Sequence, residues 1–169
     1  SRRQRQMCIR DRIYSRLIWN GGEHVSPATI EGGKERTIVI SGWSKTWAMT
    51  GMRVGFLAGP EQAVRAAVKC QANSASHIPT FMMEAARVAL DCDDHVERFS
   101  DAYRHRRNLI VQGLEDIPGL RIVNPEGAFY LFIDVTGTGM SDVQFADGAL
   151  KAGVQLIPCL LYTSDAADD

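Results

Sequence analysis

Two basic residues of this sequence, eight positions apart, have side chains that could take part in a chemical reaction. Lys45 lies in the loop "SGWSKTWAMTG", directly after the apolar run "RTIVIS", and Arg53 follows it by eight residues. A lysine amine held partly away from water can act as a nucleophile, and the planar guanidinium of arginine suits a phosphate. Small residues beside the lysine, among them Ser41 and Ser44, let backbone and hydroxyl donors approach an anion. The pattern predicts a reactive amine beside a bound phosphate.

The segments on either side of this loop predict the elements that position it. The β-branched run at residues 36–41 indicates a buried strand. Residues 52–60 indicate a second strand, which stops at a Gly-Pro pair. Pro60 opens an expected helix, and another helix begins near Pro79. The broad apolar stripe of this second helix predicts that it is well buried.

The second half of the chain continues the alternation of helices and strands. A long helix is expected from Asp93 to about Asp116, because acidic residues suit the positive end of the helix dipole. Residues 121–135 predict two strands around a Pro-Glu-Gly turn, Ser141 caps an amphipathic helix, and residues 153–158 start a further strand. The core face of the long helix is expected to hold Val96, Phe99, Tyr103, Leu109, Ile110 and Leu114. This alternation is typical of the α/β class.

Composition and charge exclude several classes of function. The 169 residues are 45% hydrophobic and 23% charged, with a formal net charge of −1, as in ordinary globular domains. The near-neutral balance predicts no nucleic acid partner and no anionic membrane surface, and no apolar run has the roughly 20 residues of a membrane span. Cys70 and Cys92 lack metal-ligand spacing. We therefore expect free thiols, no metal and a cytoplasmic protein.

The two ends of the chain are related to each other through nucleotides. With suitable codons, residues 2–11 can be written as a nucleotide sequence. The reverse complement of that nucleotide sequence, read in a frame shifted by one base, translates to residues 159–168 in order. This relation predicts that residues 1–12 and 159–169 are translated sequencing-library adapter and not natural sequence. We therefore expect the natural segment, residues 13–158, to be an internal part of a longer protein.

The whole lysine loop resembles a known cofactor-attachment segment. The string "SGWSKTWAMTGMRVGF" is similar to the pyridoxal-phosphate segment of the class I/II aminotransferases of fold type I. In that family the lysine binds the cofactor as an imine and the later arginine binds its phosphate, which implies these roles for Lys45 and Arg53. The hydroxyl groups of Ser41 and Ser44, beside the lysine, are further candidate phosphate ligands. Two residues depart from the family pattern, because Trp43 replaces a smaller apolar residue and a glycine at position 42 replaces a phosphate-binding serine.

Three further segments keep the order of the family. "DRIYSRLIWNGGEHVSPAT" resembles the stretch in which an aspartate pairs with the pyridine nitrogen and a tyrosine bonds the ring hydroxyl. Tyr14 takes the tyrosine role, and Asp11 stands at the aspartate position although the adapter encodes it. The segments "QANSASHIPTFMMEAA" and "PEGAFYLFIDV" are also similar to aminotransferase sequences. In the latter, the alternation of Phe129 and Tyr130 predicts that one ring faces a core.

The resemblance implies the α/β fold of a fold type I enzyme. Residues 13–105 would form the C-terminal part of its three-layer large domain, which binds pyridoxal 5'-phosphate, and residues 106–158 would begin the small C-terminal α/β domain. The implied activity is amino-group transfer between an amino acid and a 2-oxo acid, with aspartate or a broad range of amino acids, in a homodimer. We expect the chain alone to be inactive, because the family's carboxylate-binding arginine and other phosphate ligands fall outside it.

Two other functions are compatible with the same residues. Fold and cofactor do not fix the reaction, so a lyase or decarboxylase of the same fold is one alternative. The other is an aminotransferase-like sensor domain of a transcription regulator. An upstream DNA-binding domain would distinguish that regulator from an enzyme.

Overall fold

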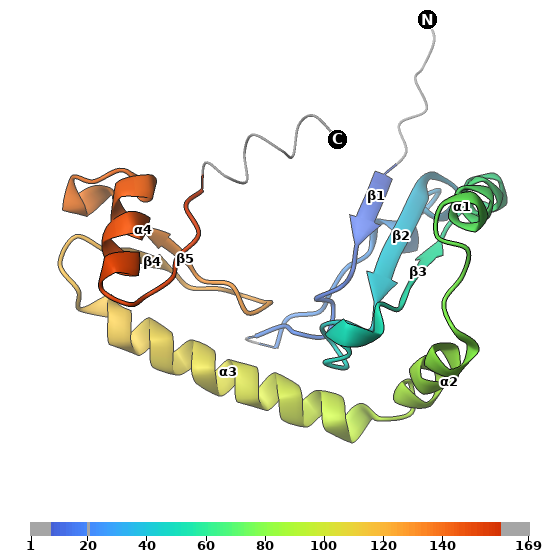
Figure 1. The fold of residues 1–169 in the computed structure, drawn as a ribbon, viewed down its shortest axis with the longest axis horizontal. Coiled ribbons are helices and arrows are strands. Elements are labelled where there is room, and N and C mark those ends of the chain that lie inside the picture. Colours follow the sequence, from blue (N-terminus) through green and yellow to red (C-terminus); the bar gives the residue numbers. More distant parts are fainter. Residues whose placement is uncertain (1–7, 20, 160–169) are drawn as a thin grey trace, which may run out of the picture. The chain divides into compact units, whose positions relative to one another are not determined.

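The computed structural model describes residues 8–19 and 21–159. Their contacts divide the chain into two compact units, with the boundary inside a long helix (Figure 1). The first unit holds the described residues up to Arg104 together with Glu126–Phe129, and the second holds His105–Pro125 with the described residues from Tyr130 onward. Each unit combines helices with short strands, so the predicted α/β class is confirmed.

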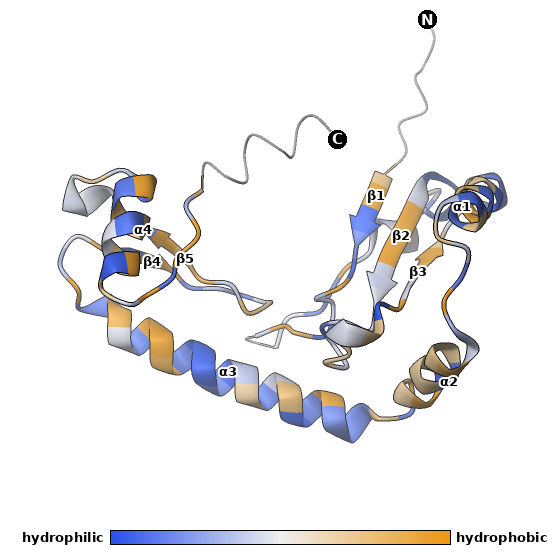
Figure 2. Ribbon diagram, in the orientation of Figure 1, coloured by the Kyte–Doolittle hydropathy of each residue, from blue (hydrophilic) through white to orange (hydrophobic). Residues whose placement is uncertain are grey.

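The first unit contains a three-stranded sheet in the order β1-β2-β3. β1 (Cys8–Asp11) runs parallel to β2 (Thr37–Gly42), and β3 (Gly55–Ala58) runs antiparallel to β2. β2 is mainly hydrophobic (Figure 2). Thr37 and Val39 are buried whereas Ile40 is exposed, so the central strand presents one face to the core of the unit.

β1 comes from the end of the chain that the sequence predicts to be adapter. It pairs with β2 along its whole length, but all four of its residues are exposed. Backbone pairing of this kind depends little on side-chain identity, because the hydrogen bonds join main-chain groups. Residues 1–7 and 160–169 of the predicted adapter ends lie outside the described residues, and the adapter origin stays a prediction.

β3 is shorter than the strand predicted across residues 52–60. Thr50–Met52 form a 3-10 turn, and Arg53 takes a left-handed backbone conformation with φ of 53°. That conformation breaks a β ladder, so β3 begins only at Gly55. The strand predicted at residues 36–41 is confirmed, shifted by one residue.

Three helices follow β3. α1 (Glu61–Ser74) begins after Pro60, α2 (Thr80–Ala89) begins after Pro79, and α3 (Asp93–Glu115) begins with the predicted acidic turn. The prediction that α2 is well buried is wrong, because only its Ala86 is buried. Of the expected core face of α3, only Val96 is buried. Amphipathic spacing determines which face of a helix is apolar, whereas burial requires another element to cover that face.

The core of the first unit lies around Leu17 and Trp19, whose side chains are almost wholly buried. The other buried apolar residues of this unit come from β2, from the approach to β3, from α2 and from α3: Val39, Val54, Ala86 and Val96. Val39 and Val54 stand on either side of the lysine-bearing loop. The core therefore anchors both ends of that loop.

The second unit combines a short hairpin with one helix. β4 (Arg121–Val123) and β5 (Phe132–Asp134) run antiparallel, as predicted. α4 (Asp142–Lys151) begins at the predicted Ser141 cap, whose hydroxyl accepts a hydrogen bond from the Gln144 N–H at 3.2 Å. The strand predicted at residues 153–158 is wrong, because within the described residues this segment joins no ladder. A β-branched run becomes a strand only when a neighbouring strand pairs with its backbone.

None of the helices within residues 8–19 and 21–159 has both the length and the hydrophobicity needed to cross a bilayer. The same described ranges contain no group of three histidine, cysteine or acidic side chains that is close enough to hold a metal ion.

Candidate active site

The lysine loop, residues 43–54, joins β2 to β3 and is closed by backbone hydrogen bonds. The Trp43 N–H donates to the Val54 carbonyl at 3.1 Å, and the Trp43 carbonyl accepts from the Met49 N–H at 3.2 Å. Thr46, in the middle of the loop, is only 3% exposed. These contacts give the loop a fixed path, so its lysine has a defined position.

A glycine at position 42 is required by the close approach of β2 and β3. A Cβ atom built on Gly42 would lie 2.8 Å from the carbonyl oxygen of Val54 and 3.2 Å from the Cα of Gly55. Neither neighbour can move aside, because both belong to backbone, and so no side chain fits. The serine that many family members carry here would need a wider gap. Ser41 and Ser44 are the hydroxyl residues that flank this glycine in sequence.

The Trp43 side chain connects the lysine loop to α2. Its indole N–H donates to the Ala86 carbonyl at 2.8 Å. Ala86 lies in the last turn of α2, where carbonyl groups have no partner within the helix. The indole ring also contacts Trp47 and Phe56, with ring centroids 5.7 and 5.8 Å away. The residue that departs from the family pattern therefore caps a helix end from inside the loop.

Lys45 and Tyr14 meet at the ring of Phe129. The Lys45 Nζ lies 5.1 Å from the ring centroid, and the Tyr14 ring meets Phe129 edge-on at 5.3 Å and 82°. Tyr103 of α3 stacks against the same ring at 5.3 Å and 24°. Phe129 and Tyr130 are 39% and 56% exposed, so the prediction that one of them faces a core is wrong. Phe129 is instead the shared contact of the site.

Arg53 lies at the far end of the lysine loop and is exposed. Its Nη1 donates to the Thr50 carbonyl at 3.1 Å, which uses one of the five N–H donors that an arginine presents. Ser41, at the end of β2, and Ser44, in the loop, are half-buried. An amine, a guanidinium and two serine hydroxyl groups therefore lie within residues 41–53.

Asp11 and Tyr14 line a cavity of about 320 Å³ in the first unit. The Asp11 carboxylate accepts a hydrogen bond from the backbone N–H two residues later, at 2.9 Å. His24 lines the same cavity, and its Nε2 lies 3.3 Å from Nη2 of Arg10. Burial, followed by the charges of Arg12 and Arg10, lowers the pKa of His24. This cavity combines the Asp11 carboxylate with two basic side chains, those of Arg10 and His24, beside Tyr14.

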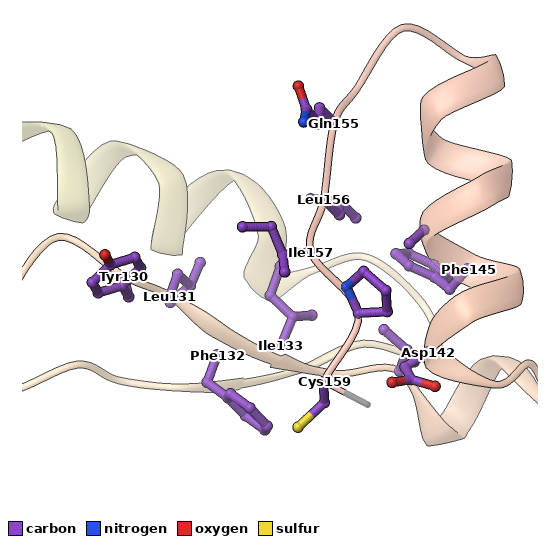
Figure 3. A pocket seen from close by; sticks show the side chains of 13 residues that line it. Tyr130, Leu131, Phe132, Ile133, Asp142, Phe145, Gln155, Leu156, Ile157 and Cys159 are labelled. Carbon is purple, nitrogen blue, oxygen red and sulfur yellow. The ribbon is translucent and has the colours of Figure 1, made fainter. Parts of the chain in front are cut away.

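A larger cavity, of about 570 Å³, lies within the second unit. Figure 3 shows its lining, which comes from residues 130–135, from α4 and from residues 155–159. None of the site residues predicted from the sequence belongs to this lining, and none of its residues is lysine, arginine or histidine. A phosphate would find no cationic partner there, so this cavity is not the candidate active site.

Sequence reasoning missed two contacts of the site. It assigns Tyr103 only to the core face of a helix, whereas the structure stacks this ring on Phe129. It also treats Trp43 only as a departure from a pattern, although Trp43 binds the Ala86 carbonyl. The N–H of a half-buried tryptophan usually finds a hydrogen-bond partner. That signal was present in the sequence, but it does not say which distant residue is the partner.

The sequence of this chain is similar to that of a known protein family and of individual relatives. The model of the family described as aminotransferase class I and II matches residues 1–165. The chain belongs to this family. The aromatic-amino-acid aminotransferase 2 of Thermococcus litoralis is 39% identical, over 90% of this chain and 40% of its own length. The arginine–pyruvate transaminase of Pseudomonas aeruginosa is 38% identical, over 94% of this chain and 41% of its own length.

Solved structures of this aminotransferase family share the fold of the chain. The aromatic aminotransferase of Pyrococcus horikoshii superposes with a TM-score of 0.86 at 38% identity, covering 90% of this chain and 41% of that one. The aspartate aminotransferase of Thermus thermophilus with maleate gives 0.83 at 34% identity, covering 90% and 40%. The fold is therefore that of the fold type I aminotransferases. The chain spans about 40% of the length of these relatives.

Proposed function

We propose that this chain is the lysine-bearing part of a pyridoxal-phosphate-dependent transaminase, which exchanges an amino group between an amino acid and a 2-oxo acid. One observation carries the proposal: the Lys45 amine and the Tyr14 ring meet at Phe129. These residues are distant in sequence, and the fold brings an amine and a phenol to one place. The resemblance implies that these same two groups bind one cofactor.

The chemical groups around the loop fit pyridoxal 5'-phosphate. This cofactor presents an aldehyde, a ring hydroxyl and a phosphate, and the chain offers the Lys45 amine, the Tyr14 phenol and the Arg53 guanidinium in turn. Ser41 and Ser44 add hydroxyl donors for the phosphate. The pyridine nitrogen would pair with a carboxylate at position 11. Because the sequence predicts that an adapter encodes Asp11, the proposal assigns this role to the position.

Each residue of the chain has a distinct task in this proposal. Lys45 Nζ would hold the cofactor through its aldehyde group, and as a free amine it would accept the proton of the substrate α-carbon. Arg53 holds the phosphate through charge-assisted hydrogen bonds, and Tyr14 orients the ring through its hydroxyl. When bound, pyridoxal phosphate supplies the electron sink for the reaction.

The substrates are an amino acid and a 2-oxo acid, and the protein acts as a homodimer. The relatives named above are an aromatic-amino-acid, an arginine–pyruvate and an aspartate aminotransferase, so their named amino acids differ in charge and size. We propose that the side-chain class is selected mainly by residues outside this chain. The exposed apolar residues of α1 and α2, among them Val68 and Phe81, support a further subunit or domain surface there.

The test uses the protein expressed from the intact gene and loaded with pyridoxal phosphate. Aspartate, phenylalanine and arginine are added separately, and the visible absorbance of the lysine-bound cofactor is followed. A transaminase loses this absorbance with at least one amino acid and regains it when a 2-oxo acid is added. Lys45→Ala should abolish both changes, whereas Lys69→Ala, on the exposed surface of α1, should leave them intact.

Two outcomes would overturn the proposal. Release of carbon dioxide, or of an elimination product, without recovery by a 2-oxo acid would show a decarboxylase or lyase on the same fold. Absence of any spectral response to amino acids, combined with an upstream DNA-binding domain in the intact gene, would show a sensor domain.

A further inference from the structure

We propose that Phe129 is a positioning residue for Lys45, whose free amine it holds as a cation over its ring while no cofactor or substrate occupies that amine. The inference rests on the proposed function, since it concerns the state of the same lysine before it reacts. Phe129 lies 84 positions after Lys45 in the sequence, and no lysine-loop motif includes it.

The segment that carries Phe129 is fixed firmly into the first unit. The Trp19 N–H donates to the Glu126 carbonyl at 2.7 Å, and the Ala128 N–H donates to the Leu17 carbonyl at 2.8 Å. The indole N–H of Trp19 also donates to the Ala128 carbonyl, at 3.0 Å. Leu17 and Trp19 are 0% and 1% exposed. The residue before Phe129 is thus bound on both its N–H and its C=O by Leu17 and Trp19, the two most buried large side chains among the described residues.

The backbone at Ala128, directly before Phe129, has a strained conformation. Its φ is 58°, in the left-handed region that residues with a Cβ rarely adopt. Gly127 lies close to the backbone of Leu17, because a Cβ at position 127 would approach the Leu17 carbonyl oxygen to 2.9 Å. Strain of this kind persists only where surrounding contacts enforce it, and it is concentrated at functional sites.

The ring of Phe129 then meets one cation and two phenol rings. The Lys45 Nζ lies within the distance at which an aromatic face attracts an ammonium group, about 6 Å from the centroid. Tyr14 approaches edge-on and Tyr103 stacks, so the ring is held from two sides. Because Phe129 is 39% exposed, the attraction should belong to the weaker, solvent-exposed range of such contacts.

This contact predicts how readily the Lys45 amine reacts. The ring attracts only the ammonium form, whereas nucleophilic attack requires the neutral amine, so the amine must leave the ring before it reacts. Weakening the contact should therefore speed attack by Lys45 by about two- to fivefold. A purely structural Phe129, which only fills space, predicts no dependence on the electron density of its ring.

The experiment replaces Phe129 by phenylalanine carrying one, two or three fluorine atoms, which nearly preserves shape while withdrawing charge from the ring face. The cofactor-free protein from the intact gene is labelled with trace acetic anhydride. Peptide mass spectrometry then gives the rate at Lys45 relative to the exposed Lys69 of the same molecule. We expect the acetylation rate at Lys45, relative to that at Lys69, to rise with each fluorine. Phe129→Leu should reach the full increase of about two- to fivefold, which is the size expected for a solvent-exposed cation–π contact. Phe129→Tyr should restore the wild-type rate.

The same fluorine series on Phe132, which is 63% exposed on β5, serves as the control and should leave the rate at Lys45 unchanged. A flat rate across the Phe129 series would overturn the inference, as would equal rates in Phe129→Leu and Phe129→Tyr. Because these measurements use no cofactor, they separate a failure of the inference from a failure of the proposed transamination.

Discussion

Arg53 combines an unusual backbone conformation with the charge that a phosphate site needs. A non-glycine residue at a φ of 53° costs on the order of 1–2 kcal/mol relative to ordinary backbone. Within the described residues, the hydrogen bond that its guanidinium donates goes to the Thr50 carbonyl. A strained, exposed arginine that uses one of its five N–H donors on its own loop suits the role of an anion ligand.

Arg53→Ala should weaken retention of pyridoxal phosphate in the intact protein. A charge-assisted hydrogen bond contributes about 1.5–3 kcal/mol, which corresponds to roughly a tenfold to hundredfold loss in affinity. Equilibrium dialysis of the cofactor measures this directly. Arg65→Ala is the matched control, because Arg65 pairs with Glu61 on the exposed face of α1 at 2.6 Å. Equal affinities in the two variants would contradict the phosphate role of Arg53.

His24 should make the stability of this chain depend on pH. Burial, and then the charges of Arg12 and Arg10, lower the pKa of His24 in the folded state below its ordinary value of 6.5. As the pH falls through 6.5, the unfolded chain takes up a proton that the folded chain resists. The free energy of unfolding should therefore decrease between neutral pH and the lower folded pKa.

The measurement is the melting temperature of the chain between pH 7.5 and pH 5. The decrease should be smaller in His24→Gln than in the parent chain, since glutamine does not titrate. His77→Gln, at an exposed position, should leave the decrease unchanged. An identical pH profile for the parent chain and His24→Gln would show that His24 does not cause the dependence.

At the scale of the elements, the sequence predicted the features that depend on near neighbours. Pro60 and Pro79 mark the starts of α1 and α2, and Ser141 caps α4 through the N–H of Gln144. These signals act within one helical turn, so the sequence contains both partners. The lysine loop between β2 and β3 was also predicted, because apolar runs bounded by small residues mark its two strands.

Features that depend on distant partners could not be predicted in the same way. The burial of α2 was overestimated, because its apolar stripe does not reveal what covers it. The segment at residues 153–158 reads as a strand but has no partner in the described residues. The contacts of Tyr103 with Phe129 and of Trp43 with Ala86 join residues far apart in the chain. Such pairs follow from the fold, and local periodicity contains no information about them.

Trp43→Phe should separate the lysine loop from α2. The change keeps an aromatic ring but removes the N–H that binds the Ala86 carbonyl, which should cost about 1 kcal/mol of stability. Trp47→Phe is the control, because within the described residues the buried indole N–H of Trp47 has no hydrogen-bond partner. Urea unfolding of both variants gives the comparison, and equal free energies of unfolding would contradict the capping role of Trp43.

At the scale of the whole molecule, much of the apolar surface of the described residues remains in contact with solvent. α1 has no buried residue, and Phe81 and Val88 of α2 are 69% and 49% exposed. Large exposed apolar residues that follow a helical stripe mark a surface for further protein. The relatives are more than twice as long as this chain. This comparison supports the proposal that the active enzyme contains further domain structure and a second subunit.

The most direct test of the account is to locate the cofactor bond in the intact protein. The loaded protein is reduced with borohydride, digested, and its peptides are mapped for a pyridoxyl group. The role proposed for Lys45 predicts a label on this residue, on the loop between β2 and β3, and loss of that label in Lys45→Ala. A label on Lys34, Lys69 or Lys151 in place of Lys45, or no label on any lysine, would contradict it.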